Sequence, residues 1–276
     1  MKNIIIKIFG GGILLTFLLS SLSAQTFMLQ NEPKDKSQFE VRYLRPYFDH
    51  DDDMSTFSGV YDFSFNIPVS SKINMVGSLP YTTISFDDED SESAIGNIYL
   101  GIQTRSEPSA DKSSSLSVGI FLPTAPDDKW SCSSFGWFTN YHDVQKYAPD
   151  VVTLYSNYAG YKTNPDGARF GFELGPSFCI PTGDDTDDEM ELFLHYGFSC
   201  GLQLNRFALS AELIGLAFIS EDFDKFSDRF VHSLVMGGQW TNGTVRPELF
   251  YKIYLKDDLN DFIDGVLGIK LDVFLN

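Results

Sequence analysis

One pentapeptide in this sequence matches a motif for nucleophilic catalysis. Gly197-Phe198-Ser199-Cys200-Gly201 fits the G-x-S-x-G pattern of a hydrolase nucleophile elbow. That motif needs a strand, a sharp turn that exposes the serine, and then a helix. Here the pentapeptide lies inside an unbroken run of alternating apolar and small residues, which predicts one continuous strand. We therefore interpret the match as coincidental.

Serine and histidine on a barrel wall could also carry out lipid hydrolysis. His195 and Ser199 share one strand face, but at ~3.3 Å per residue they lie about 13 Å apart. Proton transfer needs contacts of about 3 Å. His232 and Ser233 are adjacent, so their side chains point to opposite faces of a strand. We expect no enzyme and no catalytic residues, with an outer-membrane lipid hydrolase as the less favoured alternative.

Clustered carboxylates form the third candidate chemistry. Two dense groups are available, made of Asp51, Asp52 and Asp53 and of Asp184, Asp185, Asp187 and Asp188. Carboxylate oxygens are the preferred ligands of hard divalent cations, but the glycine spacing of an EF-hand is missing. We expect these runs to attract divalent cations weakly through their summed field rather than through fixed coordination. We predict no cofactor.

The acidic residues recur along the chain in a regular way. Six runs, at 49–53, 87–92, 127–150, 184–191, 221–228 and 257–264, contain most of the 38 acidic residues. Between neighbouring runs lie two apparent strands joined by a short turn, at 70–71, 107–114, 163–167, 205–206 and 241–244. Two alternating kinds of loop indicate two ends that face different environments. This pattern is typical of an up-and-down β-barrel that crosses a membrane, with long loops outside and tight turns on the periplasmic side.

Period-2 alternation predicts twelve antiparallel strands in a transmembrane barrel. Within 168–181 the apolar face includes Phe172, and the opposite face includes Gly171. Within 262–275 we assign Ile263 and Ile269 to the outward apolar face and Asp264 to the lumen. The predicted strands are 39–48, 56–69, 72–86, 94–105, 115–123, 151–162, 168–181, 191–204, 207–219, 229–240, 245–255 and 262–275.

The first residues predict how the chain reaches a membrane. Lys2 and Lys7, an apolar stretch at 13–22 and a small-residue site ending at Ala24 are typical of a secretory signal peptide. We predict a signal peptide at 1–24, a periplasmic lead-in at 25–38 that is too short to plug a barrel, and the barrel domain at 39–276. The expected location is the outer membrane of a Gram-negative bacterium.

Charge and cysteine content restrict the partners. A formal net charge of −18 argues against nucleic acid, because phosphate binding needs a basic face. The expected partners are outer-membrane lipid and a small-molecule solute. Cys132, Cys179 and Cys200 are odd in number, so free thiols are favoured over a Cys132–Cys179 bridge near the outer rim.

The alternation also predicts which charged side chains line the lumen. They are Glu40, Arg42, Asp62, Arg169, Glu173, Glu212, Arg246, Glu248, Lys252, Lys270 and Asp272. These charges could pair across a closed interior, as in a structural barrel. Alternatively, the inward glycines could leave room for a slender channel. The sequence leaves both outcomes open.

Three short motifs carry a family resemblance. The segments at 96–102 (GNIYLGI) and 117–124 (SVGIFLPT) and the Pro-Thr-Gly at 181–183 resemble the outer-membrane barrels named for the meta-pathway of phenol degradation. Asn97 replaces the acidic residue of that family, and Ala125 replaces one glycine. The resemblance implies transport and supplies no catalytic residues. The favoured function is therefore diffusion of a small hydrophobic or cationic molecule, and the alternative is a closed structural or partner-binding barrel.

Overall fold

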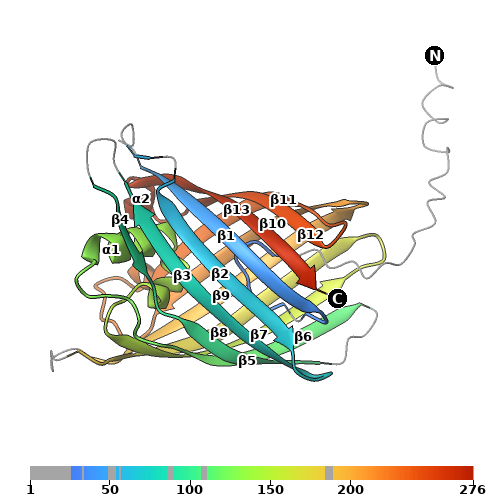
Figure 1. Ribbon diagram of the computed structural model, residues 1–276, viewed down its shortest axis with the longest axis horizontal. Helices are drawn as coiled ribbons and strands as arrows, with labels where there is room; N and C mark the ends of the chain where they lie inside the picture. Colours follow the sequence, from blue (N-terminus) through green and yellow to red (C-terminus); the bar gives the residue numbers. More distant parts are fainter. Residues whose placement is uncertain are drawn as a thin grey trace, which may run out of the picture.

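The strands form one closed antiparallel barrel, which confirms the predicted fold class (Figure 1). The computed structural model describes residues 26–32, 34–48, 54–55, 57–85, 90–106, 111–183 and 189–275. The sheet runs in the order β2-β1-β13-β12-β11-β10-β9-β8-β7-β6-β5-β3-β4, and pairing of β2 with β3 closes the ring.

The strand bounds follow the alternating segments closely. The strands are β1 (Ser37–Phe48), β2 (Gly59–Pro68), β3 (Ile73–Ile84), β4 (Glu92–Ile95), β5 (Tyr99–Arg105), β6 (Lys112–Phe121), β7 (Val151–Thr163), β8 (Ala168–Pro181), β9 (Glu191–Leu204), β10 (Phe207–Phe218), β11 (Phe230–Trp240), β12 (Val245–Tyr254) and β13 (Ile263–Leu275). The helices are α1 (Trp130–Thr139), η2 (Tyr141–Lys146), η3 (Phe226–Arg229) and α2 (Asp257–Asn260).

The thirteen strands occupy twelve positions around the barrel because β4 and β5 share one. Both pair with β3, through Tyr81↔Ile95 and Ser78↔Tyr99 respectively. Pro80 lies opposite the break, and its carbonyl accepts the Gly96 N–H at 2.8 Å. Proline has no N–H to donate to a ladder. The interrupted strand therefore accommodates a proline in the middle of β3.

The two faces of the barrel wall differ in polarity. In β8, Phe170 and Phe172 point outward and are 52% and 41% exposed, whereas Arg169 and Glu173 point inward and are buried. Exposed Leu, Ile, Val, Phe and Met side chains recur on the outward face of every barrel position. This is the arrangement expected of a barrel whose wall contacts hydrocarbon.

One predicted face assignment is wrong. Ile263 is fully buried in the interior and Asp264 is exposed, the reverse of the assignment from alternation. The register between β1 and β13 shifts between Tyr47 and Phe48, which pair with Gly265 and Ile263. Asp264 is the extra residue of this bulge. An inserted residue changes the parity of the strand beyond it.

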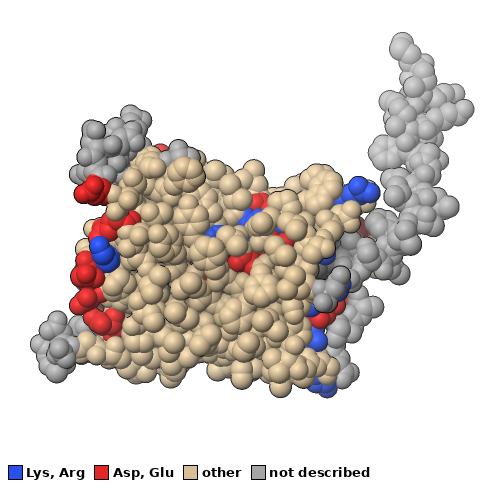
Figure 2. All heavy atoms as spheres, viewed as in Figure 1, with Lys and Arg blue, Asp and Glu red and all other residues tan. Residues whose placement is uncertain are grey.

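The barrel has two chemically different ends. Loops that follow β6, β8, β10 and β12 carry carboxylates, including Asp128, Glu189 and Asp222, and define the acidic end (Figure 2). The opposite, short-turn end carries most of the visible Lys and Arg side chains (Figure 2). Ser37 pairs with Leu275, so β1 begins and β13 finishes at the short-turn end.

Several predicted features lie outside the described residues. They are the signal peptide at 1–24 and the carboxylates Asp51, Asp52, Asp53, Asp184, Asp185, Asp187 and Asp188. Where the chain is described, no helix is both long and apolar enough to cross a membrane.

Candidate functional site

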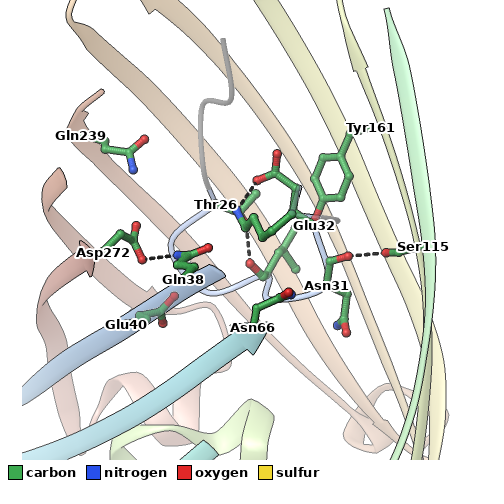
Figure 3. A network of polar contacts seen from close by, with 12 residues as sticks. Thr26, Asn31, Glu32, Gln38, Glu40, Asn66, Ser115, Tyr161, Gln239 and Asp272 are labelled. Carbon is green, nitrogen blue, oxygen red and sulfur yellow. Dashed lines mark hydrogen bonds and ion pairs between the residues drawn. The ribbon is translucent and has the colours of Figure 1, made fainter. Parts of the chain in front are cut away.

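Two segments of the chain fill the barrel interior. One is the N-terminal segment, defined here as residues 26–32 and 34–36, and the other is the folded loop, residues 122–150, which contains α1 and η2. Thr26, Asn31 and Glu32 are buried among strands that lie on different sides of the barrel (Figure 3). The prediction that this region is a lead-in too short to plug the barrel is therefore wrong. Its polar side chains and backbone find partners in a charged interior.

A single carboxylate holds the start of the N-terminal segment. Glu212 of β10 accepts the backbone N–H groups of Phe27 at 2.6 Å and Met28 at 2.9 Å. The Leu29 N–H approaches the same carboxylate at 3.4 Å. Hydrogen bonds to an ionised acceptor are about twice as strong as neutral ones. Glu212 therefore fixes three consecutive residues that have no regular secondary structure.

Asn31 is bonded to side chains of four strands, β5, β6, β7 and β8. Glu173 of β8 accepts the Asn31 backbone N–H at 2.9 Å and its Nδ2 at 2.8 Å. The Asn31 carbonyl accepts hydrogen bonds from Ser115 Oγ and from Gln103 Nε2, the latter at 3.1 Å (Figure 3). Tyr161 donates to Glu173 at 2.6 Å and holds that carboxylate in place.

Charged side chains complete the attachment of the N-terminal segment. Lys270 donates to the Thr26 carbonyl at 2.6 Å, and Arg42 donates to the Phe27 carbonyl at 3.3 Å. Glu32 forms a buried ion pair with Arg169. Burial alone would raise the pKa of Glu32, but the charges of Arg169 and Lys34 lower it below its usual value.

The folded loop enters the lumen through a second charged cluster. Lys146 of η2 contacts Asp62 of β2 at 2.5 Å and Asp143 at 3.1 Å, while Arg42 contacts Asp62 at 2.8 Å. Burial opposes the charged forms, yet the nearby Lys146 and Arg42 hold the pKa of Asp143 well below its usual range. The same carboxylates raise the pKa of Lys146 against its burial.

The break between β4 and β5 anchors both ends of the folded loop. Asn97 Nδ2 donates to the carbonyls of Gln145 at 2.9 Å and Ala148 at 2.6 Å. Its Oδ1 accepts the N–H groups of Thr124 and Ala125, both at 2.9 Å. An aspartate could not supply the two donors. The contacts at this position therefore require an amide rather than a carboxylate.

Glycine is required beside Asn97. A Cβ added to Gly96 would lie 2.2 Å from the carbonyl oxygen of Lys146. The Lys146 carbonyl accepts the Asn97 backbone N–H at 2.7 Å, so the loop approaches the wall backbone directly. The glycine of the GNIYLGI motif thus permits close contact between the wall and the folded loop.

The opposite wall holds the helical part of the folded loop. Lys252 of β12 donates to the Thr139 carbonyl at 2.7 Å, and Tyr254 OH donates to the Phe138 carbonyl at 2.8 Å. His142 Nε2 and Ser233 Oγ are 2.9 Å apart. The loop therefore spans the acidic end of the lumen from β2 to β12.

The structure places most of the predicted lumen residues in the barrel interior. All except Glu40 and Arg246 are buried. The Lys270 ammonium forms ion pairs with Glu248 at 3.0 Å, Glu40 at 3.7 Å and Asp272 at 3.8 Å. Gln38 donates a hydrogen bond to Asp272 at 2.5 Å (Figure 3). Arg246 lies at the short-turn rim, with its guanidinium 4.4 Å from the ring centre of Phe274.

Sequence reasoning missed the lumen residues that do not belong to strands. Asn31, Glu32, Asn97, Asp143 and Lys146 make many of the interior contacts. A usable signal was present in 127–150, because this run contains histidine, lysine and several aromatic residues and is far less acidic than the other five. That composition suits a buried segment better than a solvated loop.

The Ser/His pairs considered for hydrolysis are not formed. His195 Nε2 lies 2.7 Å from Ser177 Oγ, not from Ser199, and Ser233 bonds His142. His232 Nε2 instead lies 2.6 Å from the Tyr196 hydroxyl. The G-x-S-x-G pentapeptide lies within the uninterrupted strand β9, so the turn that a nucleophile elbow requires is absent there.

The cysteines and the possible metal ligands were also compared with the predictions. Cys132, Cys179 and Cys200 are all free thiols, so the considered Cys132–Cys179 bridge is not formed. Within the described ranges, no three His, Cys, Asp or Glu side chains converge as a metal site would require.

Two small spaces lie between the two inserted segments. One cavity of about 80 Å³ is bordered by Asn31, Gln103 and Lys146. A second, of about 50 Å³, is bordered by Leu29, His142 and His195. Each has room for a few water molecules at most. The two inserted segments therefore occupy much of the lumen around these cavities.

Comparison with known proteins relates this chain to others by fold. No family model matches the sequence, and no curated protein matches it. An outer membrane channel from Pseudomonas putida F1 superposes with a TM-score of 0.64 at 10% identity, covering 93% of this chain and 100% of that chain. The KdgM porin gives 0.53 at 5% identity (87% and 99% covered), and the NanC porin gives 0.52 at 8% (86% and 99%). The chain therefore has the fold of outer-membrane channel and porin barrels.

Proposed function

We propose that this protein is a diffusion channel in the outer membrane of a Gram-negative bacterium, closed here by the N-terminal segment and the folded loop. The apolar outward face and the charged interior support a membrane-spanning barrel. The barrels with similar folds are described as an outer membrane channel and as porins.

One observation carries the proposal. Glu212, Glu173 and Arg169 bond to the N-terminal segment, which continues into β1 at Ser37. In a permanently closed structural barrel, these side chains could pair with one another across the lumen. Removal of the N-terminal segment would therefore leave these charged side chains to be hydrated by water in the lumen.

The proposed solute is small and cationic. The lumen lining is polar and of mixed charge, which disfavours the hydrophobic solute also considered from the sequence. Carboxylates at the acidic end would raise the local concentration of cations. The same field would gather divalent cations weakly at this end without fixed coordination.

We place the acidic end outside the cell and the short-turn end in the periplasm, after cleavage of a signal peptide near Ala24. Cysteines introduced at Asp222 and Asn242 test this orientation, because these residues lie in exposed loops at opposite ends. An impermeant reagent should label the first on intact cells and not the second. Equal labelling would contradict the orientation.

A reversible lock on the N-terminal segment tests the channel function. A Cβ added to Gly197 would meet Leu29 Cδ2 at 2.4 Å and nothing else closer than 3.4 Å. Leu29→Cys with Gly197→Cys, in a Cys200→Ser background, should therefore form a disulfide between the segment and β9. We expect no conductance from the oxidised protein and ion passage after reduction, with each single variant as a control.

Deletion of residues 26–36 should give lasting conductance, limited by the folded loop that still crosses the acidic end of the lumen. Replacement of 127–147 by a short linker, in the same deletion, removes the second obstruction as well. A folded barrel that fails to conduct after both changes would favour the alternative, a structural or partner-binding barrel. Membership in the phenol meta-pathway family is likewise proposed on the motifs at 96–102, 117–124 and 181–183.

A further inference from the structure

An apolar groove lies on the outside of the barrel, away from the lumen. It has a volume of about 780 Å³ and crosses strands β6 to β11 near the short-turn end. Two neighbouring rows of outward residues form it. One row runs Ser114, Gly160, Phe172, Phe198, Leu213 and Leu234, and the other runs Lys112, Lys162, Phe170, Cys200 and Ala211.

Small side chains make the floor of this groove, and aromatic rings make its sides. Cys200 and Ala211 pair with each other across β9 and β10. Phe170 and Phe198, 52% and 59% exposed, flank them. The Phe172 ring lies over Gly160, where a Cβ would be 2.6 Å from the ring. The groove is therefore a hollow in an otherwise apolar wall.

Two lysines stand at one end of the hollow. Lys112 and Lys162 are directly paired in the register between β6 and β7, and both are exposed on the outward face. Like charges at directly opposed positions destabilise a sheet. A phosphate near these two exposed ammonium groups would be attracted by both charges. The hydroxyls of Ser106 and Ser114 border the same end and could donate to it.

The charged and apolar parts of the groove have the spacing of a phospholipid. The lysines lie at the short-turn ends of β6 and β7, where lipid headgroups would be. Cys200 and Ala211 lie four residues, roughly 13 Å at ~3.3 Å per residue, from the same ends of β9 and β10. We propose that the groove binds an anionic phospholipid, with its phosphate between Lys112 and Lys162 and an acyl chain over Cys200 and Ala211. This inference rests on the proposed membrane location and not on ion passage.

Cys200 provides a direct probe of occupancy. Of the three cysteines it alone is exposed, and it lies in the groove floor. The experiment measures the rate at which an apolar maleimide modifies Cys200 in the full-length protein in detergent micelles. Added phosphatidylglycerol should slow the reaction at least tenfold, and phosphatidylcholine should slow it much less. A cysteine at Leu249, outward on β12, in a Cys200→Ser background, should show no such protection.

Charge removal tests the headgroup contact. The double variant Lys112→Gln with Lys162→Gln should lose the preference for phosphatidylglycerol by roughly fivefold per lysine, the equivalent of ~1 kcal/mol per basic residue near an anionic lipid. Lys72→Gln, in the turn between β2 and β3 at the same end, should retain the full preference. Ala211→Phe fills the floor without changing charge and should abolish protection by either lipid.

Two results would overturn the proposal. Equal protection by both lipids in the wild-type protein would mean that the lysines do not select a headgroup. Protection of Cys200 that increases with protein concentration and does not depend on lipid would mean that a second copy of the chain covers the groove. Neither result depends on conductance, so a failure here is distinct from a failure of the channel proposal.

Discussion

Asp62 on the barrel wall and Lys146 on the folded loop are 2.5 Å apart, and the same Asp62 oxygen also contacts Arg42 at 2.8 Å. Arg42 in turn donates to the Phe27 carbonyl in the N-terminal segment. One wall carboxylate therefore connects, through two cations, both segments that close the lumen. Their positions are coupled through Arg42.

Asp62→Asn should destabilise the folded barrel by about 3–5 kcal/mol, because it leaves two buried cations without their shared carboxylate. Urea unfolding in vesicles measures the loss. Glu221→Gln, on an exposed loop at the acidic end, is the matched control and should change the stability little. An unchanged unfolding midpoint for Asp62→Asn would contradict the role of this cluster.

Asn97→Asp should release the folded loop from the wall. The change removes two donors and turns a carboxylate oxygen toward the carbonyls of Gln145 and Ala148. Each buried group left unsatisfied costs ~1–3 kcal/mol. Proteolysis within 127–150 should accelerate at least tenfold, while Asn242→Asp in an exposed turn leaves the rate unchanged. Equal proteolysis rates in the two variants would contradict the proposed role of Asn97 in anchoring the folded loop.

Acid should detach the N-terminal segment. The pKa of Glu32 is lowered from its usual value of 4.5, so its pairing with Arg169 stabilises the closed state above that value. This contribution falls as pH drops from 4.5 through the lower folded pKa, and raising the pH has no such effect. Channel openings should therefore increase below about pH 4.5. The Glu32→Gln channel should open more often at neutral pH and lose most of this acid response. A Glu32→Gln channel that keeps the full acid response would show that another group causes the effect.

The opened channel should select cations. Carboxylates at the mouth create a negative potential whose range shrinks from ~10 Å at 0.1 M salt to ~3 Å at 1 M. Replacing Asp184, Asp185, Asp187 and Asp188 by Asn should lower the selectivity at 0.1 M and change it little at 1 M. Reversal potentials of the variant lacking residues 26–36 provide the measurement. Anion selectivity before neutralisation would refute the electrostatic role.

The outward face should tolerate apolar changes only. Phe172→Arg places a charge on the apolar wall, four residues from the short-turn end of β8, and should lower the free energy of unfolding by up to the ~2–4 kcal/mol of a mid-bilayer position. Phe172→Leu, the matched control, should cost far less. Folding yield into lipid vesicles reports the difference, and equal yields would argue against a lipid-facing position for this side chain.

The sequence alone determined the barrel, its strand segments and the alternation of acidic loops with tight turns. These features depend on a period of two residues along each strand and on local turn composition, which are visible in one chain. The face assignments at Phe172, Glu173 and Ile269 follow from the same period. The assignments at Ile263 and Asp264 failed because a one-residue bulge opposite Tyr47 and Phe48 changes the parity.

Only the tertiary structure decided what fills the lumen. Glu212 and Phe27 are 185 residues apart in the chain. Many other interior partners are also more than 100 residues apart, and no local pattern connects them. The N-terminal segment has no periodicity to mark it as buried. Its order comes from hydrogen bonds to eight strands and from the burial of Phe27, Met28 and Leu29 in the interior. Periodicity specifies which way a side chain points, whereas the partner that it meets depends on closure of the barrel.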